Sequence, residues 1–125
     1  MKIAKGHQPV MPYLILDTST AFIEFTKKVF NATEVYKGLR NDGSGKVEHA
    51  EVQINGCNIM MGDRTEDFGV ATANLFIYVD DADATFNLAL ENGATIVNNL
   101  ADQDYGRSGG IQDPFGNVWW ITSMK

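Results

Sequence analysis

The clearest structural signal in the chain is residues 73–97, ANLFIYVDDADATFNLALENGATIV. The apolar run ANLFIYVD (73–80) predicts a β-strand, and DADATFNLALENG (81–93) predicts a helix. The helix is expected to end at Gly93, because a glycine commonly takes the left-handed conformation just after the last helical turn. ATIVNNL (94–100) then predicts a second strand. The stretch is therefore a strand–helix–strand unit.

The same order of elements occurs near the start of the chain. VMPYLILD (10–17) predicts a strand, and TEVYKGLR (33–40) predicts another. Between them, the spacing of the apolar residues in STAFIEFTKKVFN (19–31) predicts a helix. The hydroxyl of Ser19 or Thr18 is available to cap the N-terminus of this helix. The two halves of the chain therefore begin in the same way.

Each half continues with two further strands. They are expected at VEHAEVQI (47–54), CNIMMG (57–62), RSGGIQ (107–112) and VWWIT (118–122). The segments NATEV (31–35) and GATIV (93–97) also share local sequence. We expect an α+β fold of two tandem βαβββ modules, about 10–62 and 73–122, after an N-terminal tail of residues 1–9. Neither module alone buries enough surface, so a single domain spanning 1–125 is expected, with an open, curved, barrel-like mixed sheet and the helices outside.

Alternation along the strands sorts side chains into a face under a helix and a concave face. The two neighbouring tryptophans must point to opposite faces, so Trp119 is expected in the core and Trp120 in the concavity. The side chains expected to line a small-molecule pocket there are Tyr13, His49, Glu51, Gln53, Met60, Asn74, Phe76, Tyr78 and Trp120. Tyr105 and Arg107, on the loop into a strand, could reach the same mouth.

The bulk properties exclude several classes of protein. The chain has 125 residues, of which 44% are hydrophobic, a net charge of −6 and a single cysteine, Cys57. An acidic chain without a basic stripe argues against a nucleic-acid surface. No apolar run approaches the roughly 20 residues of a membrane span, and the N-terminus lacks the apolar core of a secretion signal. We therefore expect no contact with nucleic acid or with a membrane. A lone cysteine cannot form an internal disulfide, so we also expect the protein in the cytoplasm.

The doubled pattern resembles a known superfamily. The segments PYLILD, FIEFTKKVFNA, VEHAEVQING, IYVDDADATFNLALENGA and YGRSGGIQDPFGNVW are similar to the vicinal oxygen chelate superfamily over residues 10–122. This group contains glyoxalase I, bleomycin-resistance proteins and extradiol dioxygenases, and the chain looks most like its PhnB-like branch. The resemblance implies a homodimer with pockets at or near the subunit junction.

The chain departs from the metal-dependent members of that superfamily. Those members place His, Gln or Glu near the middle of the first strand and on the last strand of each half. The corresponding positions here hold Met11 or Pro12, Met60, Asn74 and Trp120. None of these is an ordinary ligand of a hard metal ion. His49 and Glu51 could coordinate jointly, but a third ligand is not evident because His7 lies in the tail. We therefore expect no metal and no cofactor.

Three functions remain open. The first is a binding protein that sequesters a small aromatic or cationic molecule, since Trp120, Tyr13 and Tyr78 could offer their ring faces to a cation. The second is a lyase- or isomerase-type enzyme, similar to glyoxalases, in which His49 is the general base and Glu51 orients it. The third is an interaction domain with a vestigial pocket.

Overall fold

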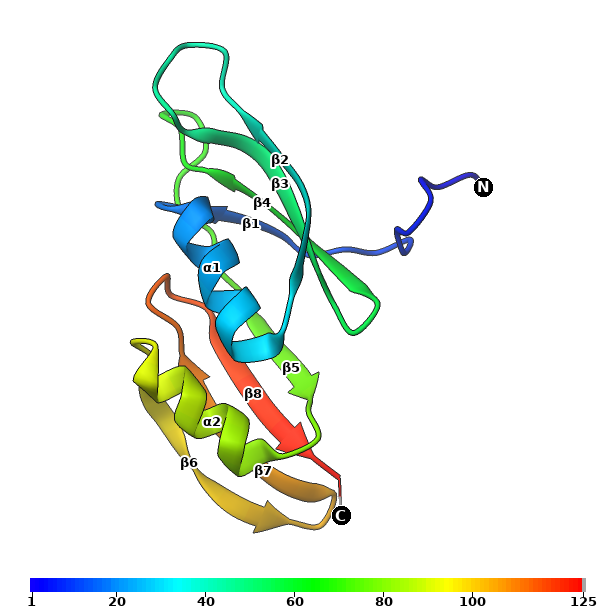
Figure 1. The fold of residues 1–125 in the computed structure, drawn as a ribbon, viewed down its shortest axis with the longest axis vertical. Helices are drawn as coiled ribbons and strands as arrows, with labels where there is room; N and C mark the ends of the chain where they lie inside the picture. The colour runs from blue at the N-terminus through cyan, green and yellow to red at the C-terminus, as the bar shows by residue number, and fades with distance from the viewer. Residues whose placement is uncertain (125) are drawn as a thin grey trace. The chain divides into compact units, whose positions relative to one another are not determined.

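Two repeated units follow one another along the chain (Figure 1). The computed structural model describes residues 1–124 and divides the chain into a first unit, Met1–Thr72, and a second unit, Ala73–Lys125. Each unit has one helix and four strands in the order βαβββ, and the strands of each unit form a separate four-stranded sheet. The α+β class and the duplicated modules are therefore as predicted.

The first unit consists of β1 (Tyr13–Leu16), α1 (Ser19–Phe30), β2 (Thr33–Leu39), β3 (Val47–Ile54) and β4 (Cys57–Asp63). Its sheet has the order β1-β4-β3-β2, in which β1 is parallel to β4 and the other pairs are antiparallel. Helix α1 covers one face of this sheet (Figure 1). The core between them includes Leu16, Phe22, Ile23, Val52 and Met61, each at most 1% exposed.

The second unit repeats this plan with β5 (Asn74–Tyr78), α2 (Ala82–Glu91), β6 (Thr95–Gln103), β7 (Gly106–Gln112) and β8 (Val118–Ser123). Its strand order is β5-β8-β7-β6, with β5 parallel to β8. Helix α2 packs on the sheet through Phe86 and Ala89, against a buried row that includes Ile111, Trp119 and Ile121. Gly93 follows the helix with φ of 98°, so the predicted helix end is confirmed.

The N-terminus of α1 is capped from a distant part of the first unit. The carboxylate of Asp63, at the end of β4, accepts the backbone N–H of Ser19 at 2.8 Å and that of Val47 at 2.8 Å. The predicted cap by a hydroxyl of Thr18 or Ser19 is wrong, because Thr18 makes no side-chain cap bond and the buried Ser19 hydroxyl has no hydrogen-bond partner among the described residues. An acceptor supplied by another strand satisfies the helix end instead, so this cap forms only when the unit folds.

Two adjacent glycines of β7 let ring side chains lie close to both faces of the second sheet. A Cβ atom on Gly109 would come within 2.9 Å of the Phe86 ring of α2. A Cβ atom on Gly110 would come within 2.6 Å of the Trp120 ring on the opposite face. Trp120 therefore lies against the backbone of β7, on the face away from the helix.

One buried carboxylate organises the turn before β8. Asp113 is 4% exposed and accepts the backbone N–H groups of Phe115 and Asn117, each at 2.9 Å. It also accepts the Asn117 side-chain amide at 3.0 Å and the indole N–H of Trp119 at 2.9 Å. The segment DPFGN thus connects the turn directly to the tryptophan that fills the core.

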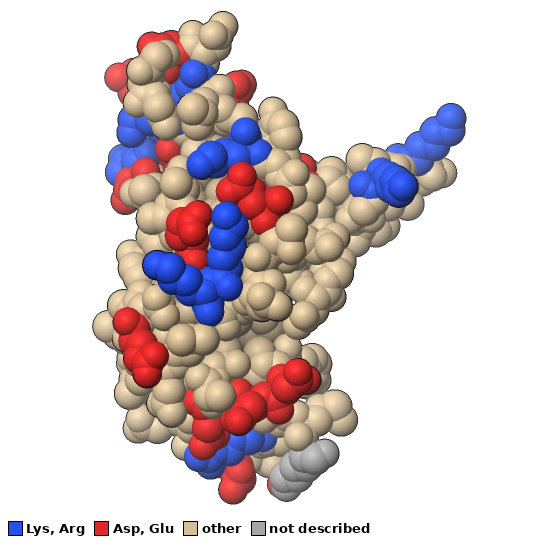
Figure 2. Space-filling view, viewed as in Figure 1, with Lys and Arg blue, Asp and Glu red and all other residues tan. Residues whose placement is uncertain are grey.

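Charged side chains of both signs are interspersed on the visible face of the molecule (Figure 2). That face carries no broad band of basic side chains. Within residues 1–124, neither helix has the length and apolar character needed to cross a membrane.

Candidate functional site

Strand β3 carries the polar row that the alternation predicted. Ala50 and Val52 are completely buried on the side of α1. His49, Glu51 and Gln53 alternate with them and therefore lie on the opposite face of the sheet. The register expected from the sequence is correct for this strand.

Glu51 is the centre of a hydrogen-bonded cluster on that face. Glu51 is 7% exposed, and its carboxylate lies 3.0 Å from His49 Nε2 through Oε1 and 2.8 Å from His7 Nε2 through Oε2. The side-chain amide of Asn58 donates to Oε2 at 3.4 Å, and Gln53 donates in turn to Asn58 at 3.0 Å. Burying these polar side chains without partners would be costly, and the hydrogen bonds among them offset that cost.

These donors set the charge state of Glu51. Burial alone raises the pKa of the carboxyl group, since it disfavours the charged form. Hydrogen bonds from His49 and His7, the charge of His7 and the bond from Asn58 act in the other direction and outweigh burial, so the pKa of Glu51 lies below its usual value. The carboxylate is thus held ionised at neutral pH.

The N-terminal segment is attached to this cluster, which the sequence did not indicate. Besides the bond from His7 to Glu51, the side chain of Gln8 donates to the backbone oxygen of Asn58 at 2.9 Å and accepts its backbone N–H at 3.2 Å. The hypothesis that His7 lies in a tail away from the site is therefore wrong. We call residues 7–8 the N-terminal arm. The one signal in the sequence was the number of polar side chains on the face of β3 and β4 opposite α1. So many polar groups on one face require hydrogen-bond partners from another segment.

His49 is also enclosed by aromatic rings. Its Nδ1 atom lies 3.2 Å from the hydroxyl of Tyr13. The ring centroids of Tyr13 and Tyr36 lie 5.5 and 6.0 Å from that of His49. Tyr36, on β2, was not among the predicted site residues. Met60 pairs with both Tyr13 and Glu51 in the strand register, so it lies between them on this face.

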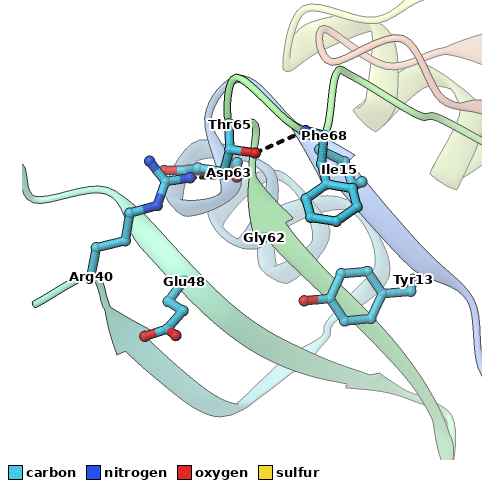
Figure 3. Close-up of a pocket in the computed structure, with 8 residues that line it drawn as sticks. All are labelled: Tyr13, Ile15, Arg40, Glu48, Gly62, Asp63, Thr65 and Phe68. Atoms are coloured by element: carbon cyan, nitrogen blue, oxygen red, sulfur yellow. Dashed lines mark hydrogen bonds between the residues drawn. The ribbon is translucent and has the colours of Figure 1, made fainter.

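A pocket of about 440 Å³ opens beside Tyr13 in the first unit (Figure 3). It is lined by Tyr13, Ile15, Arg40, Glu48, Gly62, Asp63, Thr65 and Phe68. Of the predicted ligand-binding residues, Tyr13 lines this pocket, and the others are outside its wall. Thr65 and Phe68 belong to the segment after β4, which backbone hydrogen bonds between Ile15 and Ala71 hold against β1.

The charged side chains of the pocket differ in how many bonds they already make within the protein. The Asp63 carboxylate is engaged by two backbone N–H groups, and the Arg40 guanidinium donates to the backbone oxygens of Asp63 and Arg64 at 2.6 and 2.8 Å. Glu48 is exposed, and its carboxylate has no ion pair with any residue in the described part of the chain. An irregularity in the pairing of β2 with β3 adjoins this residue, and Glu48 lines the pocket instead of continuing the alternation.

The predicted residues of the second unit share the face opposite α2. Asn74, Phe76 and Tyr78 are exposed there, and the rings of Phe76 and Tyr78 meet edge to face at 5.1 Å. The indole N–H of Trp120 donates to Asn74 Oδ1 at 3.2 Å. Trp119, by contrast, is 2% exposed in the core, so the two tryptophans divide between the faces as predicted.

Arg107 and Tyr105 lie elsewhere. Arg107 is on β7 and pairs with Asp83 in the first turn of α2, at 2.8 Å, and with Asp102 at 3.5 Å. These partners hold the guanidinium on the helix side of the sheet and raise its pKa, with the hydrogen bond to Asp83 as the largest cause. Tyr105 is exposed in the turn between β6 and β7. The structure thus gives Arg107 a structural partner away from the face of Trp120.

The side chains do not fit the metal that the superfamily resemblance implies. Two of the corresponding positions, Asn74 and Trp120, are bonded to each other through the indole N–H. In the part of the chain that the structure describes, no group of three His, Cys, Asp or Glu residues is placed to hold a metal ion. An indole can only donate, so the metal-dependent chemistry of such proteins has no counterpart in this donor set.

Comparison with known proteins identifies the family. Residues 14–121 match the Glyoxalase/Bleomycin resistance protein/Dioxygenase superfamily. The chain is 35% identical over 120 residues to an uncharacterized protein of Mycobacterium tuberculosis, across 86% of this chain and 69% of that protein. The chain therefore belongs to the Glyoxalase/Bleomycin resistance protein/Dioxygenase superfamily, as the sequence pattern predicted.

Solved structures have the same fold at low sequence identity. The PhnB protein from Bacillus cereus matches with a TM-score of 0.73 and 18% identity, over 93% of this chain and 99% of that one. The fosfomycin resistance protein FosX from Listeria monocytogenes matches with a TM-score of 0.75 and 15% identity, over 98% and 96%. At these identities the likeness establishes the fold alone.

Proposed function

We propose that this protein binds a small molecule with an aromatic ring or a positive charge in the pocket of the first unit. The observation that carries the proposal is the composition of the pocket wall. Two aromatic rings, Tyr13 and Phe68, line a volume of about 440 Å³ together with the unpaired carboxylate of Glu48. Pockets of this size hold small organic ligands, and aromatic faces attract cations.

The segment that carries Phe68 is internally braced. Phe68 accepts the backbone N–H of Thr65 through its carbonyl at 2.9 Å and donates its own N–H to the Thr65 hydroxyl at 2.8 Å (Figure 3). The turn thereby keeps a 64% exposed ring next to the pocket. An exposed ring held in place offers a preformed contact, which reduces the entropy cost of binding.

The electrostatics favour a cation over an anion. The wall holds two carboxylates, Glu48 and Asp63, against one guanidinium, Arg40. The Nη2 group of Arg40 donates to the backbone oxygens of Asp63 and Arg64, which ties this cation to the loop after β4. Glu48 is exposed in the wall and makes no ion pair within the described residues, so a positively charged group on a ligand gains a carboxylate partner there.

Matched probes of opposite charge test the proposal. Benzyltrimethylammonium and benzylsulfonate have similar size and ring content, and their binding can be measured by NMR titration. We expect the cation to bind more tightly and to shift the signals of Tyr13 and Phe68. Glu48→Gln should weaken the cation about 5-fold, since a partly exposed charge contact contributes about 1 kcal/mol. Glu91→Gln, an exposed carboxylate on α2, is the control. Equal affinity for both probes, or shifts elsewhere, would refute the proposal.

We further propose that the protein is a homodimer in the cytoplasm. The edge strands β2 and β6 expose the apolar residues Val35, Leu39, Ile96 and Val97, which supports a partner copy. Cys57 is a free, exposed thiol, which suits a reducing compartment. Light scattering at several concentrations tests the first statement, and cell fractionation tests the second. A concentration-independent monomer, or recovery outside the cytoplasm, would overturn them.

A further inference from the structure

A continuous chain of hydrogen bonds leads from a buried carboxylate to the wall of the pocket. Glu51 Oε1 lies 3.0 Å from His49 Nε2, and His49 Nδ1 lies 3.2 Å from the Tyr13 hydroxyl. Tyr13 is 51% exposed and lines the pocket, whereas Glu51 is 7% exposed. The chain therefore joins an enclosed anion to a phenol that a bound molecule can touch.

The chemistry of these groups fixes the direction of each bond. An ionised carboxylate only accepts hydrogen bonds, so His49 donates its Nε2–H to Glu51. In the neutral imidazole the other nitrogen then carries no proton, and Nδ1 accepts the hydroxyl proton of Tyr13. A carboxylate that orients an imidazole, which in turn holds a hydroxyl, is the arrangement by which a base activates a nucleophile.

Strand β4 leaves space for this contact. It lies between β1, which carries Tyr13, and β3, which carries His49. A Cβ atom on Gly62 of β4 would lie 3.5 Å from the Tyr13 hydroxyl and 2.7 Å from the backbone oxygen of Glu48. The Tyr13 hydroxyl thus lies at ordinary contact distance over Gly62, and the phenol reaches the imidazole across β4.

We propose that Tyr13 is a base-assisted phenol that attacks electrophilic small molecules in the pocket. His49 is its general base, and Glu51 is a positioning residue. The class of ligand is an activated acyl or sulfonyl compound with an aromatic ring. The phenolic oxygen forms the new bond to carbon or sulfur, the leaving group departs with its bonding pair, and the phenolic proton passes to His49 Nδ1. This activity goes beyond binding and uses the wall of the same pocket.

The test uses phenylmethanesulfonyl fluoride on the native protein at neutral pH. Reaction forms the oxygen–sulfur bond, breaks the sulfur–fluorine bond and releases fluoride, and peptide mass spectrometry gives the rate at each tyrosine. Tyr78 is the internal reference, because it is 61% exposed and its ring contact is with Phe76 rather than with an imidazole. We expect Tyr13 to react about 10-fold faster than Tyr78. Equal rates in the native protein would overturn the proposal without any variant.

Two further measurements separate base assistance from simple exposure. His49→Ala should reduce labelling of Tyr13 to the Tyr78 rate, and added imidazole should restore it, while labelling of Tyr78 in the same sample stays constant. Unchanged labelling of Tyr13 in this variant would overturn the role of His49. The role of Glu51 is tested by the ¹⁵N chemical shifts of His49, which should show the proton on Nε2 in the native protein and a redistribution in Glu51→Gln. A native proton on Nδ1 would overturn it.

Benzyltrimethylammonium titrations on the same samples distinguish this proposal from the binding function. Cation binding without preferential labelling of Tyr13 would refute the reactive phenol alone. Preferential labelling of Tyr13 without cation binding would refute the proposed cation-binding function alone.

Discussion

Replacing Asp113 by asparagine tests the turn that leads into β8, because the side chain keeps its shape but loses half of its acceptors. One carboxylate oxygen accepts the backbone N–H groups of Phe115 and Asn117. The other accepts the Asn117 amide and the Trp119 indole at 3.0 and 2.9 Å. In Asp113→Asn an NH₂ group replaces one oxygen, so one pair of donors faces another donor.

The expected magnitude follows from the bonds that are lost. A hydrogen bond to a charged group contributes about 1.5–3 kcal/mol, and water cannot substitute here because Asp113 is 4% exposed. Loss of two such bonds should lower the free energy of unfolding by about 3–6 kcal/mol, a large part of the roughly 5–15 kcal/mol typical of a domain. Urea denaturation followed by tryptophan fluorescence measures this change.

Asp104→Asn in the exposed turn between β6 and β7 is the matched control, expected within about 0.5 kcal/mol of the native protein. A loss below about 1 kcal/mol for Asp113→Asn would refute the reasoning that the four bonds hold the turn.

Four further outcomes are expected. The pKa of Glu51 is lowered from 4.5 on folding, so its ionised form stabilises the protein above that pH. The difference in the free energy of unfolding between the native protein and Glu51→Gln should therefore shrink when urea denaturation is repeated from about pH 6 down to about pH 3. A constant difference would contradict this. Trp119→Ala should lower the free energy of unfolding by about 3–5 kcal/mol, and Trp120→Ala by clearly less, since Trp120 is half-buried. Equal losses would mean that the space around Trp120 is filled like a core. His7→Ala should free the N-terminal arm, with faster limited proteolysis within residues 1–8 as the readout; an unchanged rate would show that the bond to Glu51 does not hold the arm. Elemental analysis of protein purified without added metal should find no stoichiometric zinc, nickel or iron, and about one metal per chain, removed by His49→Ala, would contradict that expectation.

The sequence was sufficient where structure depends on local periodicity. The alternation around Val52 placed His49 and Glu51 on the correct face, because a strand has a fixed period of two. The end of α2 at Gly93 was predictable for a similar reason, since the left-handed conformation there is a local demand on one residue.

Contacts between distant segments were not predictable in this way. His7 and Glu51 are 44 positions apart, and so are Ser19 and Asp63. Nothing in the periodicity of either segment specifies which partner an unsatisfied carboxylate or helix end will find. Glu48 illustrates a second limit, because the pairing irregularity beside it interrupts the alternation on which the face assignment rested.

The paired glycines of β7 restrict how this chain can change over evolutionary time. A larger residue at position 109 would collide with Phe86, and one at position 110 would collide with Trp120. Relatives that carry a side chain at position 110 are therefore expected to carry a smaller residue at position 120. The same argument couples position 109 to position 86 on the helix. Substitutions at these pairs should accordingly appear together in descendants of a common ancestor, one on each face of a single strand.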